Sequence, residues 1–385
     1  MVSDLRRFFE IIRQELIKFF HESGAMTIMI LGVVAYSLFY AIPYSAEVIK
    51  DAPIALIDMD RTELSKEFAR NIDTADSIEI VSTPMSIDEA KKEFYQRKIY
   101  GFLVIPKGFE KDIKKGYQTT ISLYTDTSYM IIYKAIYSSV MQTAGETGAK
   151  IEVAKLLKKG VPKHLALTLK QPFEFVQTPL YNAAGGYKTY VYPVILILIL
   201  HQTLLVGLGL LLGTDYELKY DYCKENDSIP STIFAKSTAY VLLYMLYSLV
   251  IFLIFPALFT YPMSYNILPL FILLVLMFYT VSFFAHTISY FFKTRESSLL
   301  VLVVTSLIFI FVPGLIWPRE AIPWFINTVS YFIPATCSID GIIKINQMGA
   351  SFWDIKYDIL WLAFLCCLYF NLSIRVLERI RRKKQ

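Results

Sequence analysis

The chain has 385 residues, of which 55% are apolar and only 18% are charged, with a formal net charge of +5. Soluble globular domains average about 25% charged residues, so this composition excludes a soluble enzyme, a disordered tail and a secreted disulfide scaffold. The four cysteines show no paired metal-type spacing and are too few for a disulfide framework.

The first predicted element is an amphipathic helix within residues 1–22. Its apolar side chains recur at helical spacing and lie apart from its basic ones; the apolar set is Leu5, Phe8, Phe9, Ile12, Leu16 and Phe19. Such a helix is expected to lie in the cytoplasmic interface of a membrane, and packing on a partner is the alternative. Residues 23–46 follow as the first span. We interpret this span as an uncleaved signal anchor, because residues 44–46 only weakly resemble a cleavage site.

Residues 47–186 read as a water-soluble α/β domain inserted between the first two spans. Strands are predicted to alternate with helices, which favours a small, mostly parallel sheet; the strands are 53–58, 78–81, 99–105 and 119–125. Asp60 with Glu63 is interpreted as a capping box, and Ser86 with Glu89 as the next helix start. A long helix is expected over 128–159, ending at Gly160.

The remaining sequence is dominated by membrane-length apolar segments. Between Lys236 and Lys293 lie 56 consecutive residues without a charged side chain. As one helix this run would extend roughly 84 Å, against a hydrocarbon core of about 30 Å, so it must cross twice. The later spans are therefore predicted at 187–214, 234–260, 265–292, 297–318 and 354–377. The intervening segments are a cytoplasmic loop at 215–233, two short re-entrant helices at 319–351 and a basic tail at 378–385.

Positive charge orients these spans. The short segments assigned to the cytoplasm hold fifteen Lys and Arg residues, and the short segments on the other side hold three. This bias predicts cytoplasmic termini and an extracytoplasmic domain at 47–186. The basic tail is interpreted as an anchor to anionic lipid rather than a nucleic-acid patch. The predicted fold class is a polytopic α-helical membrane protein with six spans and an inserted α/β domain.

Polar groups inside the predicted spans are few. Two histidines are the only ionisable groups near mid-depth, His201 and His286. His201, with Gln202 and Thr203, forms an intramembrane polar cluster whose alternative role is packing between helices. Gly209 and Gly213 form a G-x-x-x-G spacing that permits close helix approach.

The motifs of self-contained catalysis are missing. No P-loop, H-E-x-x-H or G-x-S-x-G motif occurs, and the four histidines show no ligand spacing. Asp58 and Asp60 are interpreted as turn and cap residues rather than a catalytic pair. We therefore expect no catalytic residue, no metal and no directly bound cofactor.

Several stretches of the sequence together resemble a known transporter family. They are residues 53–60 with Leu64 and Ser65, residues 86–90, residues 101–109, residues 198–213 with Thr214 and Glu217, and residues 313–318 with Pro323, Trp324 and Pro334. Their order over the whole chain resembles the permease subunit of an ABC-2 type (type V) exporter. The resemblance is to the subgroup with a large extracytoplasmic domain between the first two spans.

This resemblance implies partners and a coupling route. The permease would form a dimer with itself or a sister permease and bind two separate cytoplasmic ABC ATPase subunits, which hold ATP and Mg. Motion would reach the spans through the N-terminal helix and the loop at 215–233. The implied ATPase-coupling residues are Asp215, Tyr216, Glu217, Tyr220, Asp221 and Glu225. The Gly-Thr step that usually follows the glutamate is absent, and a solvated turn is the alternative interpretation of this loop.

The leading functional interpretation is ATP-driven export in the bacterial cytoplasmic (inner) membrane. The cargo would be a hydrophobic or amphipathic solute, drug-like or lipid-like, and the involvement of a periplasmic adaptor is left open. One alternative is a receptor or sensor whose α/β ectodomain binds a ligand. The other is an ion-coupled secondary transporter using His201 and His286, which the lack of midplane carboxylates disfavours.

Overall fold

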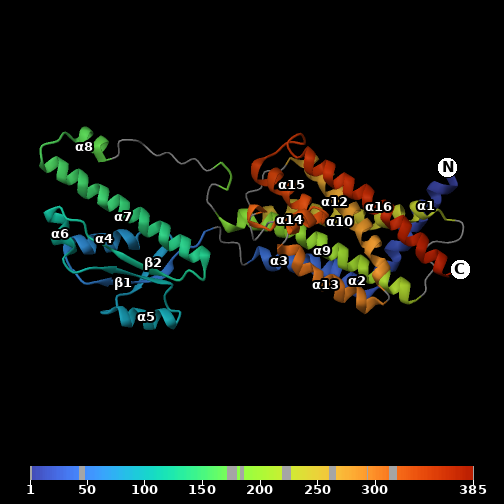
Figure 1. Cartoon of the computed structure of the whole chain (residues 1–385), viewed down its shortest axis with the longest axis horizontal. Helices are drawn as coiled ribbons and strands as arrows, with labels where there is room; N and C mark the ends of the chain where they lie inside the picture. Colours follow the sequence, from blue (N-terminus) through green and yellow to red (C-terminus); the bar gives the residue numbers. More distant parts are fainter. Residues whose placement is uncertain are drawn as a thin grey trace. The chain divides into compact units, whose positions relative to one another are not determined.

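The computed structural model describes residues 2–42, 48–170, 180–182, 186–218, 227–259, 266–292, 294–311 and 319–384. The chain divides into two compact units (Figure 1). Val48–Thr178 forms an α/β unit, and Met1–Glu47 together with Pro179–Gln385 forms a helical unit. The expected combination of membrane helices with an α/β insert is confirmed.

A four-stranded sheet organises the α/β unit. Its strands are β1 (Ala52–Asp58), β2 (Ile78–Ser82), β3 (Gly101–Ile105) and β4 (Ser122–Thr125), in the order β2-β1-β3-β4. Strand β1 pairs in parallel with both β2 and β3, whereas β3 and β4 are antiparallel. The four predicted strands and the mostly parallel arrangement are therefore confirmed.

Helices cover both faces of this sheet (Figure 1). One face carries α4 (Glu63–Asp73), α6 (Phe109–Lys115) and α7 (Met130–Lys158), whose Phe68, Phe109 and Ile136 are buried with the strands. The other face carries α5 (Ile87–Tyr95), whose Ala90 packs on Phe102 and Val104. The short α8 (Lys163–Lys170) contacts α7. Ser86 caps α5 as predicted, because its side chain accepts a hydrogen bond from Glu89 N.

The predicted capping box of Asp60 with Glu63 is wrong, because Asp60 caps a different helix. Helix α4 begins instead with a capping box of Thr62 and Ser65. Asp60 caps α6, which is distant in sequence, because its carboxylate accepts hydrogen bonds from Gly108 N at 2.7 Å and Glu110 N at 2.9 Å. Although desolvation acts in the opposite direction, these bonds and the Thr62 hydroxyl lower the pKa of Asp60.

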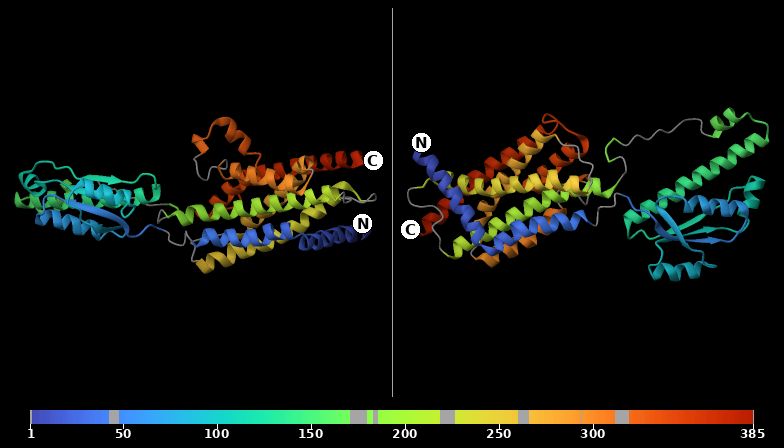
Figure 2. Two further views of the ribbon diagram at one scale, coloured as in Figure 1. Left: turned by 90° about the horizontal axis from the view of Figure 1, so that it is seen from below. Right: turned by 180° about the vertical axis from the view of Figure 1, so that it is seen from behind.

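The helical unit follows the predicted order of elements. It contains α1 (Val2–His21), α2 (Ser23–Met26), η1 (Thr27–Gly32), α3 (Val33–Ala41), α9 (Tyr187–Glu217), α10 (Ile229–Leu249), η3 (Val250–Ile254), α11 (Phe255–Phe259), α12 (Ile267–Ile288), η4 (Ser289–Phe291), α13 (Arg295–Phe311), η5 (Arg319–Ala321), α14 (Trp324–Ser330), α15 (Pro334–Met348) and α16 (Lys356–Lys384). Figure 2 shows that α1 and the end of α16 lie at the same end of this unit.

Five helices among the described residues are long and apolar enough to cross a membrane. They are Ser23–Ala41, Val191–Glu217, Ile229–Leu258, Ile267–Ile288 and Lys356–Arg382. Helix α13 covers the first part of the span predicted at 297–318, whose residues 312–318 lie outside the described ranges. The turn predicted between the third and fourth spans falls on 260–265, which are also outside them.

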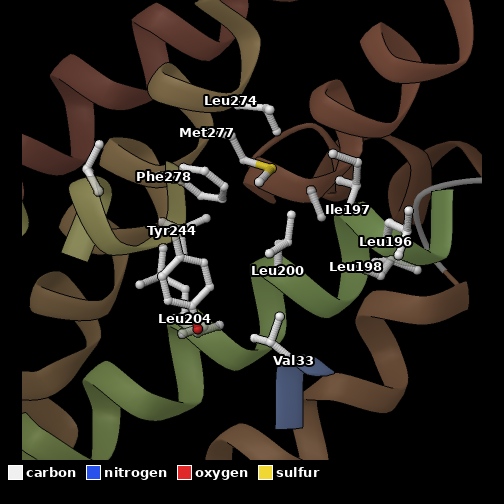
Figure 3. Packing of buried hydrophobic residues seen from close by; sticks show 14 of the residues in the cluster. Val33, Leu196, Ile197, Leu198, Leu200, Leu204, Tyr244, Leu274, Met277 and Phe278 are labelled. Carbon is white, nitrogen blue, oxygen red and sulfur yellow. The ribbon is translucent and has the colours of Figure 1, made fainter. Parts of the chain in front are cut away.

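Helix α9 is the centre of the helical unit. In the most apolar stretch of this helix 89% of the residues are buried, whereas the corresponding share is 28% in the first and last spans. Figure 3 shows its side chains meeting Val33 of α3, Tyr244 of α10 and Phe278 of α12. Helices α13 and α15 also pack on it. A helix enclosed in this way can be apolar all round, which explains why its sequence shows no amphipathic pattern.

The segment predicted to re-enter the membrane does contain two helices, α14 and α15. Helix α15 is mostly buried against α9, α12 and α16. Two ion pairs hold the segment, Arg319 to Asp340 at 2.7 Å and Lys344 to Asp358 at 2.6 Å. In addition, Trp361 Nε1 donates a hydrogen bond to the carbonyl oxygen of Tyr331. The depth of these helices in a bilayer stays a prediction.

The capping role of Asp60 makes a local prediction. In an Asp60→Ala variant of the intact chain, we expect the free energy of local unfolding of α6 to fall by about 1–2 kcal/mol. Its amide protons should then exchange about tenfold faster with solvent. Folding lowers the pKa of Asp60, so this stabilisation is complete at pH values above the ordinary pKa of an aspartate. It is lost as the pH falls through the lower pKa that Asp60 has in the folded protein. Hydrogen–deuterium exchange of residues 108–116 measures both effects.

The control is Glu63→Ala, since Glu63 forms an exposed pair with Lys66. We expect this variant to leave α6 protected. Equal exchange in the two variants, or unchanged exchange in Asp60→Ala, would contradict the assignment.

Candidate functional site

Helix α1 lies along α10 rather than standing apart. Ile11 and Ile12 are buried against Ala235 and Ala239, whose small side chains permit the close approach. The neighbouring edge of α1 leaves Leu5, Phe9, Ile17 and Phe20 exposed. One apolar face of the predicted amphipathic helix therefore packs on α10 of the same chain. The adjoining apolar side chains are exposed.

Four charged side chains meet where α1, α9 and α10 come together; three of them are buried and Lys18 is partly exposed. Lys18 Nζ lies 2.5 Å from Asp215 Oδ1 and 3.9 Å from Glu15 Oε1. Lys236 Nζ lies 3.3 Å from Glu15 Oε2 and 3.9 Å from Asp215 Oδ2. The hydroxyl of Tyr240 donates a hydrogen bond to Glu15 Oε1 at 3.1 Å. We call Glu15, Lys18, Asp215 and Lys236 the ionic cluster.

The ionic cluster is electrically balanced, and three of its four members are buried. Glu15, Asp215 and Lys236 are 7%, 5% and 5% exposed. Burial by itself favours the neutral acid, but the ammonium groups of Lys236 and Lys18 lower the pKa of Glu15 below its ordinary value. A buried charge without a partner is costly, so each member depends on the others. The ionic cluster therefore holds the three helices together, because separating its charges would cost a large amount of free energy.

A second ion pair extends this junction toward the loop between α9 and α10. Arg7 donates to both carboxylate oxygens of Asp227, from Nε at 3.0 Å and from Nη2 at 2.9 Å. This bidentate geometry is the strong form of the Arg–carboxylate contact. The bond to Asp227 and a second bond to Glu10 raise the pKa of Arg7, although burial opposes the shift. Arg7 near the start of α1 thus pairs with Asp227 just before α10, and Lys18 near its end pairs with Asp215 of α9.

A pocket of 290 Å³ lies between these contacts. It is lined by polar and charged side chains of α1, α9 and α10, including Gln14, Thr214 and Thr232 in addition to the ionic cluster. Described residues hold no group of three or more potential metal ligands. The polar part of the lining suits a polar side chain or water.

The structure distributes the predicted ATPase-coupling residues over different environments. Asp215 is not a loop residue, because it lies in the last turns of α9 and belongs to the ionic cluster. Tyr216 is 42% exposed beside it, and Glu217 Oε2 accepts a hydrogen bond from Arg295 N at 3.2 Å. Tyr220, Asp221 and Glu225 lie outside the described residues.

The predicted intramembrane polar cluster lies inside the helical unit. His201 is fully buried, and the Thr203 hydroxyl donates to Ile199 O and accepts a hydrogen bond from the Tyr244 hydroxyl at 3.0 Å. The buried amide atoms of Gln202 have no hydrogen-bond partner among the described residues. The packing alternative therefore accounts for Thr203, while a role of this cluster in transport stays a prediction.

Gly209 and Gly213 lie where α9 meets α13. A Cβ at Gly213 would come within 3.0 Å of Thr294 O and of Ser298 Oγ. A Cβ at Gly209 would overlap the side chain of Leu302. The lack of a side chain at these two positions permits the α9–α13 contact.

Sequence reasoning did not identify three members of the ionic cluster. Lys236 was visible only as the last charge before the long uncharged run. Glu15 lies between Ile11, Ile12 and Phe19 on the buried face of α1, where an acidic residue is out of place. A charge on an apolar helix face was therefore the available signal, since such a charge needs a partner.

The chain matches the model of a known protein family. A family model described as ABC-2 family transporter protein matches residues 24–375. No curated protein matches the chain. The matched range contains the α/β unit and three of the described spans whole, and most of the first and last, Ser23–Ala41 and Lys356–Arg382, whereas α1 with Glu15 and Lys18 precedes it.

The ionic cluster predicts an unequal response to the removal of two lysines. We expect Lys236→Met to cost about 3–5 kcal/mol, because Glu15 and Asp215 would stay buried with one ammonium group between them. Lys66→Met is the control, since it removes an exposed pair with Glu63 and should change stability by less than about 0.5 kcal/mol. Thermal unfolding of the purified full-length chain in detergent measures both.

A double variant, Glu15→Gln with Lys236→Met, removes one charge of each sign. It should regain part of the lost stability, because the remaining pair of Lys18 and Asp215 is balanced. Equal melting temperatures for Lys236→Met and Lys66→Met would show that the ionic cluster does not hold the helices together.

Proposed function

Because the chain belongs to the ABC-2 transporter family, we propose that it is the membrane-spanning subunit of an ATP-driven exporter. It is a multi-pass membrane protein, and family membership implies an ABC ATPase as its partner. The proposed cargo is a hydrophobic or amphipathic solute that leaves the cytoplasm or the inner leaflet. The proposed assembly contains two permease copies, alike or related, in a bacterial inner membrane.

The observation that carries this proposal is the ionic cluster. It joins α1, at one end of the helical unit, to α9, the helix at the centre of that unit. A partner that pushes on α1 or on the charged end of α9 would displace both helices, because separating them exposes buried charges. The contacts therefore support transmission of an ATPase movement into the membrane helices.

The distribution of carboxylates supports an external energy source. From Tyr187 to Thr214, which is nearly all of α9, the sequence contains no Asp or Glu. Proton- and ion-coupled pathways commonly use intramembrane carboxylates or histidines. His201 is fully buried, and the lack of carboxylates along this part of α9 favours coupling to a separate ATPase.

Affinity purification from native membranes tests the assembly. We expect the tagged chain to retain an ATPase subunit, and the reconstituted complex to hydrolyse ATP faster than the ATPase subunit alone. The absence of any associated ATPase, together with transport that continues without ATP, would contradict the proposal.

Charge reversal tests the transmission route in the same complex. Lys18→Asp and Asp215→Lys each place like charges together, and each should reduce stimulation of ATP hydrolysis about tenfold, within the usual range of coupling energies. The double variant restores opposite charges and should recover most of the stimulation. Lys66→Asp in the α/β unit serves as the control. Full stimulation in both single variants would exclude the ionic cluster from the route.

A further inference from the structure

A second pocket, separate from the ionic cluster, opens between the first span and α13. Its volume is 330 Å³. It is lined by Ser23, Gly24, Thr27 and Ile28 of α2 and η1, by Leu210 of α9, and by Arg295, Glu296 and Leu299 of α13. None of these residues lines the pocket between α1, α9 and α10.

The lining changes from charged to apolar along the helices. Arg295 and Glu296 are the first two residues of α13, at the end of the helical unit where α9 finishes. Leu210 precedes the last residue of α9 by seven positions, which places it about 10 Å deeper along that helix. Together with Ile28 and Leu299 it forms an aliphatic inner wall. A pocket with one ionic end and one aliphatic end suits an amphiphile rather than a free ion.

An ion pair positions the guanidinium of Arg295 at the ionic end. The guanidinium pairs with Glu22 at 3.0 Å, beside Gly24 in the first turn of α2. A Cβ at Gly24 would overlap this guanidinium, so the glycine permits the crossing. A guanidinium carries five N–H donors and is suited to a phosphate as well as to a carboxylate.

The local charge balance selects among lipid headgroups. Among the described residues, three carboxylates lie around the positive charge of Arg295, those of Glu22, Glu217 and Glu296. An anionic headgroup would therefore meet more negative than positive charge from these described side chains. A headgroup with both a phosphate and an ammonium group satisfies both signs, with the phosphate at Arg295 and the ammonium at Glu296. A primary ammonium also donates N–H bonds to a carboxylate, which a trimethylammonium cannot.

We propose that this pocket binds a membrane phospholipid with a primary ammonium headgroup, of the phosphatidylethanolamine type. The headgroup occupies the ionic end, and the acyl chains follow the aliphatic wall into the adjoining leaflet. The site requires only the folded chain in a membrane or detergent. It therefore does not depend on an ATPase partner or on the direction of transport.

Native mass spectrometry of the purified, delipidated full-length chain tests the proposal. The probes are phosphatidylethanolamine, phosphatidylcholine and phosphatidylglycerol with identical acyl chains. For the wild type we expect about fivefold stronger retention of phosphatidylethanolamine than of phosphatidylglycerol, with phosphatidylcholine between them. No ATPase or nucleotide is present, so the result is independent of the test of proposed function.

Two variants address the two ends of the pocket. Glu296→Gln removes the carboxylate assigned to the ammonium group and should abolish the preference for phosphatidylethanolamine over phosphatidylcholine. Its control is Glu378→Gln, an exposed carboxylate on α16 outside the pocket. Leu299→Trp fills the aliphatic end and should reduce retention of all three lipids at this site. Its control is Leu300→Trp, the next residue of α13, which is 70% exposed and does not line the pocket.

The competing outcomes are distinct. Equal retention of the three lipids by the wild type, or stronger retention of phosphatidylglycerol, would overturn the proposal. So would identical lipid retention by Leu299→Trp and Leu300→Trp. Should Leu299→Trp fail to fold, the comparison of Glu296→Gln with Glu378→Gln still decides the headgroup assignment.

Discussion

Buried charges impose the strictest constraint on the helical unit, because each must keep an opposite charge within reach. Glu15 and Lys18 of α1 face Asp215 of α9 and Lys236 of α10, with carboxylate to ammonium distances from 2.5 to 3.9 Å. Attraction inside a protein is stronger than in water, and so is the penalty for an unpaired group. The positions of α1, α9 and α10 at their shared end follow from this balance.

The rest of the helical unit is arranged around α9. Its apolar surface is enclosed by α3, α12, α13 and α15. If the charged end of α9 is displaced, the helix therefore pushes against the side chains of these neighbours. Close-packed interiors resist continuous deformation and move as connected pieces. The small residues Gly209 and Gly213 bring α13 against the same helix. This continuity links the ionic cluster to most of the membrane-spanning part of the chain, consistent with the family to which it belongs.

Elements with a strong local signal were predictable from the sequence. The strands of the α/β unit alternate with capped helices, and the spans are long uncharged runs, so composition and periodicity located both. Contacts between residues far apart in sequence were not predictable in this way. Asp60 has the local signal of a helix cap, but the fold places α6 against it and Thr62 takes the local role.

The candidate site shows the same limit. Asp215 follows the second span and therefore looks like a loop residue, although α9 continues to Glu217 and buries it. Its partners are Lys18, 197 positions earlier, and Lys236 on the next helix. No periodicity connects such positions. The one sequence signal that could have identified Glu15 is the general rule that a charge on an apolar face needs a partner.

Transmission through the ionic cluster requires that α1, α9 and α10 move together when ATP binds to the complex. Spin labels at Arg13 on α1 and Phe234 on α10, two exposed positions, would report their separation by pulsed electron resonance. The same pair of labels is measured in the assembled complex with and without nucleotide. We expect one unchanged distance distribution in both states. A separation of α1 from α10 on ATP binding, with ATP hydrolysis intact, would contradict transmission by this route.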